Sequence, residues 1–243
     1  MALLLATNAP ASAPVDLSPL GLAHLGLLSA VIVLAAALTV LQRTVLRGSP
    51  WLRLGVGAVL LAETLGWYAF QARLGQLTTA HLPLELCDLT LFLVIVELFT
   101  LSAAVFDVCY YLALAGTSMA LLTPDLWERF PSLSTCQFFF AHGLVVAAVL
   151  YLAGSGLARP RPGSVVRAML AANLWAVVAG SFDWILHTNY MYLRHKPQQN
   201  SLLDLLGPWP WYIAGGEAVA LVLFLLLYLP FWRASRRSAA DSR

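Results

Sequence analysis

Long apolar runs alternate along the chain with short stretches that carry charged residues, proline or glycine. Seven runs are long enough to form helices, at about residues 20–42, 52–72, 82–101, 105–122, 134–154, 165–190 and 210–232. A helix needs roughly 20 mainly apolar residues to cross the ~30 Å hydrocarbon core of a bilayer. The pattern therefore predicts an all-α protein, a polytopic membrane helical bundle of seven transmembrane helices.

Helices are expected rather than strands, because the runs do not alternate as the roughly ten-residue strands of a membrane barrel do. Helices also satisfy their own backbone hydrogen bonds, which lipid cannot do for them. The third and fourth runs are kept separate, although residues 102–107 carry no cation, because a merged run of about 40 residues is too long for one crossing. Composition agrees, since 60% hydrophobic residues, 11% charged residues and a mean hydropathy of +0.78 exclude an ordinary soluble domain.

The basic residues predict the orientation of the bundle. A seven-span threading sorts the 14 Lys and Arg residues ten to four, and the richer side is normally cytoplasmic. The ten are Arg43, Arg47, Arg53, Arg159, Arg161, Arg167, Arg233, Arg236, Arg237 and Arg243. We therefore expect an N-terminus outside and a C-terminus inside, with an external tail over 1–18, a transmembrane domain over 19–232 and a basic cytoplasmic tail over 233–243.

Charge and cysteine content narrow the classes further. The net charge of +2 is spread over several loops, so no nucleic-acid partner is expected. Residues 1–18 contain no Lys or Arg and so lack the basic region of a cleavable signal peptide. Cys87, Cys109 and Cys136 have unrelated spacings and indicate neither a disulfide framework nor a zinc ribbon.

Polar residues inside the runs gather toward the outer half of the predicted bundle. Charged groups within a membrane are costly and normally face the bundle interior or a watery cavity. The sequence therefore predicts one polar cavity that opens outward. Besides the candidate catalytic residues, its predicted lining is Glu85, Asp88, Thr117, Ser118, His187, Asn189 and Glu217.

Three chemically reactive residues fall at matching depths in this predicted cavity. At a rise of ~1.5 Å per residue, Cys87 lies roughly 8 Å, Asp183 roughly 10 Å and His142 roughly 12 Å below the outer ends of their helices. Cys87 is the candidate nucleophile, His142 its base and Asp183 the group that orients the imidazole. Two alternatives stay open for Cys87: it is a small buried apolar residue, or it forms a disulfide with Cys136.

Several acidic residues also admit structural roles. Glu85 and Asp88 share a helix face at i, i+3. Repulsion between two ionised carboxylates raises the pKa of one of them, which suits a proton donor or acceptor. The structural alternative is that they pack against Ser, Thr or Asn. Asp183 and His187, at i, i+4, can satisfy one another. Glu217 can contact a substrate or clamp a neighbouring helix.

Two other functions compete with catalysis by cysteine. One is an outward-open transporter or receptor for a small solute, with Glu85, Asp88, Asp183 and Glu217 as proton or cation sites. The other is a zinc-dependent seven-span lipid hydrolase with His and Asp ligands from three helices. The chain has no His-Glu-x-x-His motif and no pair of histidines at i, i+4, so no metal or other cofactor is expected.

Five segments together resemble the YwaF-type bacterial integral membrane family, over about residues 50–230. They are His81–Asp88, Leu122–Leu126, Phe140–Gly143, Asn189–Pro197 and Ser201–Tyr212. That family is distantly similar to eukaryotic transmembrane acyltransferases that remodel ether phospholipids. It is more distantly similar to the androgen-induced transmembrane hydrolases of fatty acid esters of hydroxy fatty acids.

The resemblance implies intramembrane acyl chemistry on membrane lipids, in a bacterial cytoplasmic membrane. The acyltransferases use a Cys early in a middle span and a His in a later span, which correspond to Cys87 and His142; the hydrolases use Thr in place of the Cys. The context here is Leu-Cys-Asp, whereas the eukaryotic proteins have Pro-Cys-His.

The favoured prediction is that a lipid enters sideways from the outer leaflet and Cys87 attacks an ester carbonyl with His142 as general base. The acyl group then passes to a lysolipid or to water. Thr117 or Ser118 is expected to donate a hydrogen bond to the oxyanion.

Overall fold

The computed structural model describes residues 21–124, 126, 130–197 and 202–241, and within these ranges all regular secondary structure is helical. The predicted external tail over 1–18 lies outside the described residues, as does Arg243 at the end of the predicted basic tail. The main elements are α1 (Leu22–Thr44), α2 (Trp51–Arg73), α3 (Leu86–Thr100), α4 (Ala103–Tyr111), α5 (Ser118–Leu122), α6 (Leu133–Ser155), α7 (Ser164–Leu186) and α8 (Trp211–Asp241). Short helices η1 (Thr79–His81), η2 (Leu112–Thr117), η3 (Tyr190–Tyr192) and η4 (Leu202–Leu206) complete the described set.

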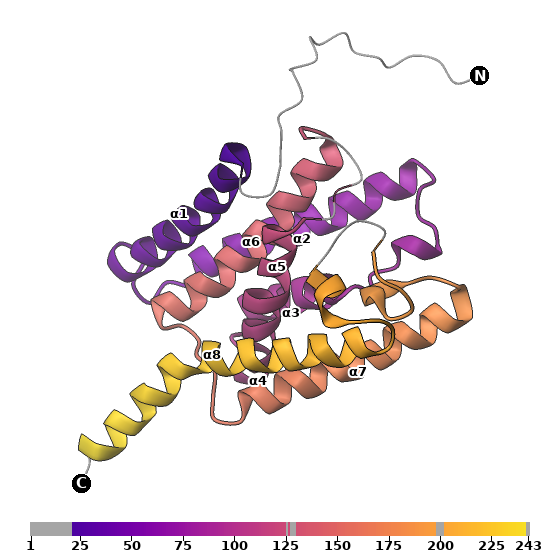
Figure 1. Cartoon of the computed structure of the whole chain (residues 1–243). Helices are drawn as coiled ribbons and strands as arrows, with labels where there is room; N and C mark the ends of the chain where they lie inside the picture. Colours follow the sequence, from indigo (N-terminus) through magenta and orange to yellow (C-terminus); the bar gives the residue numbers. More distant parts are fainter. Residues whose placement is uncertain (1–20, 125, 127–129, 198–201, 242–243) are drawn as a thin grey trace.

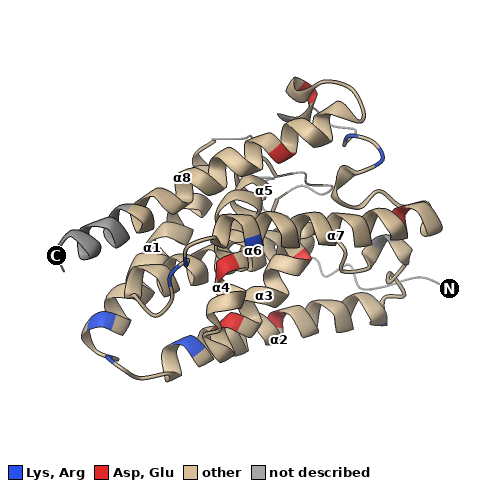
Figure 2. Cartoon of the chain, turned by 90° about the horizontal axis from the view of Figure 1, so that it is seen from below, with Lys and Arg blue, Asp and Glu red and all other residues tan. Residues whose placement is uncertain are grey.

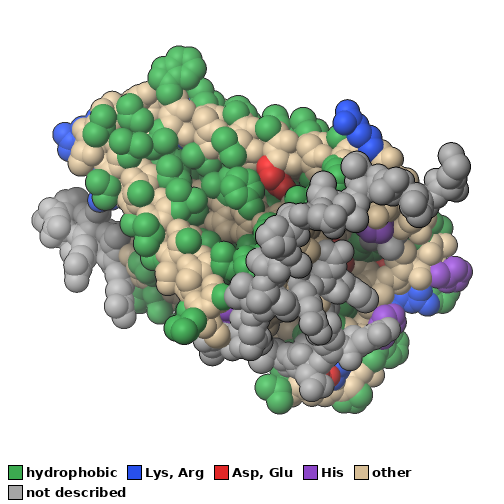
Figure 3. All heavy atoms as spheres, turned by 90° about the horizontal axis from the view of Figure 1, so that it is seen from above, with side chains coloured by type: hydrophobic (Ala, Val, Ile, Leu, Met, Phe, Trp, Pro, Cys, Tyr) green, Lys and Arg blue, Asp and Glu red, His purple; other side chains and the backbone are tan. Residues whose placement is uncertain are grey.

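Five segments are long and apolar enough to cross a membrane. They are α1, the continuous stretch Ala103–Leu122, α6, α7 and the part of α8 from Trp211 to Trp232. Few of the residues in α1, α7 and α8 are buried, and Figure 3 shows large apolar side chains spread across one face of the molecule. An exposed apolar surface of this kind suits contact with lipid rather than water.

The third predicted span is shorter than expected. The run at 82–101 forms a helix of only 15 residues, α3, which is about 22 Å long at ~1.5 Å per residue. Glu85 has extended backbone angles before its first turn, and Leu101 ends it in the left-handed region with φ of 49°. Because α4 begins again at Ala103, the separation of the third and fourth runs is confirmed.

The fourth run is one continuous helical segment with an irregular middle. Between α4 and α5 the six residues of η2 form a π-helix, a wider turn that is often found at functional sites. The widening changes the direction in which the following side chains point. It brings Thr117, the last residue of η2, into the interior of the bundle, where only 2% of its surface is exposed.

The helices pack around α3, η2 and α6. In Figure 1, α1 runs alongside α6, and α7 lies beside α8 on the opposite side of the molecule. The connection from α1 to α2, the connection from α6 to α7 and the end of α8 lie at one end of the bundle (Figure 1). Figure 2 shows that Lys and Arg lie close to the ends of helices, whereas several Asp and Glu residues lie within the bundle.

One buried carboxylate is neutralised by arginines at that end. Asp107 of α4 is fully buried, and its Oδ2 lies 2.6 Å from Arg161 and 2.9 Å from Arg167. Asp107 Oδ1 also accepts a hydrogen bond from the backbone N–H of Arg161. The cluster therefore fixes the connection between α6 and α7 against α4.

Candidate functional site

A cavity of about 150 Å³ lies between α2, α3, η2 and α6. Its lining residues are Glu63, Thr64, Trp67, Tyr68, Cys87, Asp88, Leu91, Thr117, Gln137, Ala141, His142 and Val145. Two of the three reactive residues predicted from the sequence, Cys87 and His142, are among them, whereas Asp183 is not. Helices that are distant in sequence thus bring a thiol and an imidazole to one small polar space.

The hydrogen bonding of His142 determines which ring nitrogen is available. His142 Nδ1 lies 2.9 Å from the carbonyl oxygen of Phe138, one turn earlier on α6. A carbonyl can only accept, so Nδ1 must carry the proton and Nε2 keeps its lone pair. The Phe138 ring stacks on the imidazole with 4.1 Å between centroids, which holds the ring plane. His142 is therefore arranged to accept a proton through Nε2.

Cys87 lies in the first turn of α3, and its thiol is free. The hydroxyl of Thr117 interacts with this thiol. Thr117 Oγ1 is buried and makes no hydrogen bond of ordinary geometry to the rest of the described chain. The cavity thus places a buried hydroxyl next to the candidate nucleophile.

The wall formed by α2 adds residues that the sequence did not assign to the site. Glu63, Thr64, Trp67 and Tyr68 follow a helical spacing that places them on one face of α2. Gln137 donates a hydrogen bond of 2.8 Å to Glu63 Oε1 and so links α6 to α2. The helical spacing of polar and aromatic residues in the second run was the signal for this wall.

Asp183 does not orient His142, which corrects the prediction. Asp183 Oδ1 accepts hydrogen bonds of 2.8 Å from the Thr188 hydroxyl and from the backbone N–H of Tyr190. Its Oδ2 has no hydrogen-bond partner among the described residues. The Asp183 carboxylate anchors the chain that follows α7. The Phe138 carbonyl, and not Asp183, orients the imidazole of His142.

The acidic pair at the start of α3 has mainly structural contacts. Asp88 Oδ2 accepts a hydrogen bond from the backbone N–H of Glu85, at 3.0 Å, which caps the helix. Glu85 Oε2 accepts one from the backbone N–H of Met191, at 2.9 Å. Asp88 also lines the cavity, whereas Glu85 is not among the described lining residues.

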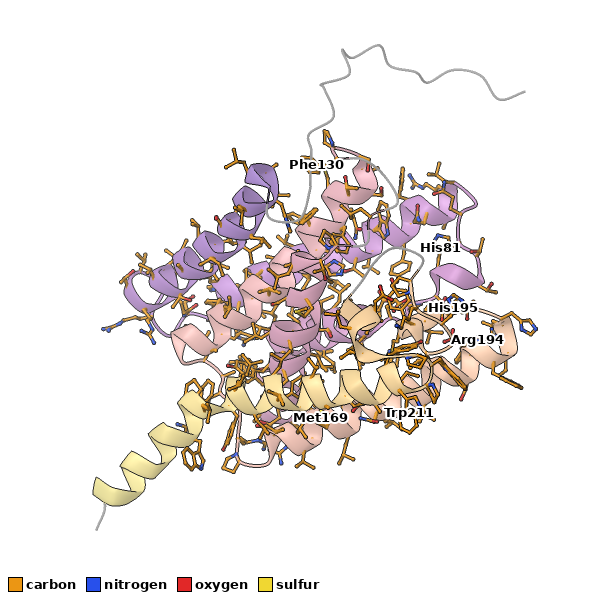
Figure 4. The ribbon with its side chains drawn as sticks, in the orientation of Figure 1. His81, Phe130, Met169, Arg194, His195 and Trp211 are labelled. Atoms are coloured by element: carbon orange, nitrogen blue, oxygen red, sulfur yellow. The ribbon has the colours of Figure 1, made fainter. Side chains whose placement is uncertain are left out.

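Four further predicted cavity residues lie outside the cavity. Asn189 binds the backbone of Arg194 and His195, within the segment after α7 that Figure 4 shows at the end of the bundle. His187 is exposed and ends α7 with φ of 57°. The Ser118 hydroxyl donates to the Ala113 carbonyl at 3.2 Å. None of these three lines the cavity in the described part of the chain.

Glu217 is the fourth residue placed outside the cavity. Its Oε2 accepts a hydrogen bond of 2.9 Å from Asn173 Nδ2. The contact joins α8 to α7, and Glu217 is not one of the described cavity residues. The structure thus favours the helix clamp over substrate contact.

A wider groove adjoins the cavity. It has a volume of about 860 Å³ and lies between the end of α2 and the start of α6. Its apolar lining residues are Trp67, Phe70, Leu74, Leu126, Leu133 and Phe138. Trp67 and Gln137 line both spaces, so they lie at the boundary between the groove and the cavity.

The structure bears on two alternatives, a disulfide between Cys87 and Cys136 and a bound zinc ion. Cys87, Cys109 and Cys136 are all free, so Cys87 and Cys136 do not form a disulfide. Among the described residues, no three His, Cys, Asp or Glu side chains come together as a group that could hold a metal ion. The zinc-hydrolase alternative therefore has no ligand set in this geometry.

Together these features define a class, a multi-pass α-helical membrane protein with a polar cavity inside its bundle. The family follows from the sequence: residues 19–228 match the model of the TMEM164 family, and the chain belongs to that family. No curated protein and no solved structure matches the chain. Membership of a membrane-protein family is thus confirmed, whereas the YwaF-type label and the link to acyltransferases stay predictions.

Proposed function

We propose that this protein is an intramembrane acyl-transfer enzyme, a phospholipid acyltransferase or lipid ester hydrolase, that uses Cys87 as nucleophile and His142 as general base. The observation that carries the proposal is their shared cavity, in which the Nε2 lone pair of His142 is free. A cysteine needs an adjacent base to become a strong nucleophile. His142 supplies that base without help from a carboxylate.

The reaction takes place in two balanced steps. His142 Nε2 takes the thiol proton, and Cys87 Sγ attacks the ester carbonyl of a donor lipid; the C–S bond forms, the ester C–O bond breaks, and the imidazolium returns the proton to the leaving alkoxide. In the second step an acceptor hydroxyl gives its proton to His142 and attacks the thioester. The C–O bond forms, the C–S bond breaks, and the thiolate is reprotonated.

Thr117 is the oxyanion donor in this mechanism. Its hydroxyl is buried in the cavity wall, without an ordinary partner, and beside Cys87. A donor positioned before the reaction stabilises the charge that develops on the carbonyl oxygen. Ser118 is not suited to this role, because its hydroxyl donates to Ala113.

The two connected spaces suit a lipid substrate. A cavity of about 150 Å³ is large enough for a molecule the size of benzene, so it holds the reacting ester but not a whole acyl chain. The adjoining groove of about 860 Å³ falls within the usual range of ligand sites. We infer that the acyl chain lies along the groove and that its ester reaches Cys87 past Trp67 and Gln137.

The proposed topology has seven spans, with the N-terminus outside and the C-terminus inside. In this threading α2 and α3 also cross the membrane, with Glu63 of α2 directed into the bundle instead of toward lipid. The groove and cavity then lie in the outer half of the bundle, where a lipid of the outer leaflet enters sideways. A bacterial cytoplasmic membrane remains the predicted location.

The transporter or receptor alternative has less support. It depended on Glu85, Asp88, Asp183 and Glu217 as sites for protons or cations. Each of these carboxylates accepts a hydrogen bond from the protein, three of them from the backbone. These contacts are typical of residues that fix helix ends and loops.

Acyl transfer by purified single-residue variants tests the proposal. Cys87→Ala and His142→Ala are expected to remove transfer from a labelled phospholipid to a lysophospholipid while the proteins remain folded. Cys136→Ala is the matched control, because it removes an exposed free thiol from α6. Full activity in both Cys87→Ala and His142→Ala would show that the mechanism is wrong.

A further inference from the structure

A polar side chain lies in the middle of the exposed apolar surface of α7. Asn173 is exposed, and its neighbours on the same helix face are large apolar residues: Leu170, Leu174 and Val177 are 65%, 68% and 67% exposed. Asn173 comes nine residues after Ser164, where α7 begins. At ~1.5 Å per residue it lies roughly 14 Å along a helix that crosses a ~30 Å hydrocarbon core. An amide at that depth has no water to bind.

Glu217 of α8 lies beside this amide. Its Oε2 accepts a hydrogen bond of 2.9 Å from Asn173 Nδ2, which also donates to the Met169 carbonyl at 3.0 Å. Both N–H groups of the Asn173 amide are therefore used. Asn173 Oδ1 and Glu217 Oε1 form no hydrogen bond within the described part of the chain. Each residue thus keeps one polar atom for a partner outside the chain.

The two remaining atoms are complementary to one another. An isolated charge in hydrocarbon is very costly, so the Glu217 carboxyl is neutral and carries a proton. Its Oε1–H can then donate a hydrogen bond, whereas Asn173 Oδ1 can accept one. Lipid acyl chains offer neither a donor nor an acceptor. A second copy of the same pair offers both, because a twofold axis places each residue opposite the other.

Small residues of α8 allow another helix to approach the Glu217 position closely. Ala214 and Ala218 lie one turn apart and are both exposed. A Cβ atom added at Gly216 would meet nothing within 4 Å. Small residues at i, i+4 let the backbones of membrane helices come together. In Figure 1, α7 and α8 lie on the side of the molecule opposite α1, so a second copy can reach them without displacing another helix.

We propose that two copies of this chain form a homodimer in the membrane through the α7–α8 face, which consists of Asn173, Ala214, Glu217 and Ala218. Glu217 Oε1–H donates to Oδ1 of Asn173 of the partner subunit, and the twofold axis repeats this hydrogen bond. The two α8 helices approach one another at Ala214 and Ala218. The inference concerns assembly and does not depend on the chemistry at Cys87.

Energy transfer between labelled copies in vesicles tests the proposal. Full-length protein with a donor or an acceptor fluorescent protein at the C-terminus is reconstituted in phosphatidylethanolamine and phosphatidylglycerol, and transfer is measured as lipid is added. The unmodified protein is expected to form a dimer that dissociates on dilution. Ala218→Leu is expected to raise the dissociation constant by about tenfold or more, because the larger side chain keeps the helices apart.

Variants of the polar pair test the hydrogen bonds themselves. Asn173→Leu and Glu217→Leu each remove both symmetric bonds, so the dissociation constant is expected to rise by about tenfold to a hundredfold. Glu217→Gln is expected to change it by less than about threefold, because a neutral amide also has a donor and an acceptor. A loss in Glu217→Gln as large as that in Glu217→Leu would contradict the proposed pairing.

Ala36→Leu is the matched control. It introduces the same side chain at an exposed alanine of α1, on the other side of the molecule, and is expected to leave the dimer unchanged. Ala218 is exposed, so its variant keeps the test valid if Glu217→Leu does not fold. Energy transfer no higher than that of randomly distributed monomers would overturn the proposal. A dimer that is unaffected by Ala218→Leu would also overturn it, because the contact would then lie elsewhere.

Discussion

Replacement of Thr117 by valine is expected to separate stability from activity. Thr117 is 2% exposed, and its hydroxyl makes no ordinary hydrogen bond to the described residues. An unsatisfied buried hydroxyl costs about 1–3 kcal/mol, so its replacement by a methyl group is expected to leave the free energy of unfolding unchanged or to increase it. The same hydroxyl is the proposed oxyanion donor. Loss of such a donor lowers kcat by about 10²–10³, or roughly 2.7–4 kcal/mol.

Thr90→Val is the matched control for this prediction. Thr90 is also fully buried, on α3, but its hydroxyl donates to the Leu86 carbonyl at 2.7 Å. Its removal is expected to cost up to about 1 kcal/mol of stability and to leave acyl transfer intact. Thermal unfolding in detergent and transfer to a lysolipid are measured for both variants. The reasoning is refuted if Thr117→Val retains full activity, or if it loses as much stability as Thr90→Val.

Three further predictions concern residues that the structure places outside the cavity. Asp183→Asn is expected to keep the rate of Cys87 acylation within about threefold of the unmodified protein. Hydrogen exchange at the Tyr190 amide is expected to become faster, because its acceptor loses its charge. Loss of Cys87 acylation in a folded protein would contradict this prediction. A double-mutant cycle of Asn173→Leu and Glu217→Leu is expected to give a coupling of about 0.6 kcal/mol, and zero coupling refutes the clamp. Asp107→Asn is expected to lower the free energy of unfolding by about 1–3 kcal/mol. This is less than for a fully buried salt bridge, because Arg161 and Arg167 are partly exposed. An unchanged unfolding curve would contradict the prediction.

The helices and the shared position of two reactive residues were accessible from the sequence. The length of the apolar runs located every long helix in the described chain, and depth along the helices placed Cys87 and His142 together. Depth works in this case because the predicted threading aligns the helices along one membrane axis, so distance along each helix approximates position along that axis. Depth contains no information on the direction in which a side chain points around its helix.

The wrongly placed site residues have two causes, the direction in which a side chain points around its helix and the position at which a helix ends. The sequence predicted a run to residue 190, but α7 ends at Leu186, so Asp183 lies in its last turn and anchors the following segment. Thr117 and Ser118 are neighbours that differ by about 100° around a helix, and the π-helix decides that Thr117 faces the cavity. Glu63 was not assigned to the site because its contact with Gln137 joins two helices that are far apart in the sequence.

The most direct test of the account is peptide mass spectrometry of the protein after incubation with a donor phospholipid and no acceptor. The account predicts a thioester-linked acyl group on Cys87 alone, absent in His142→Ala and released when a lysolipid is added. An unmodified Cys87 in a preparation that transfers acyl chains would contradict it.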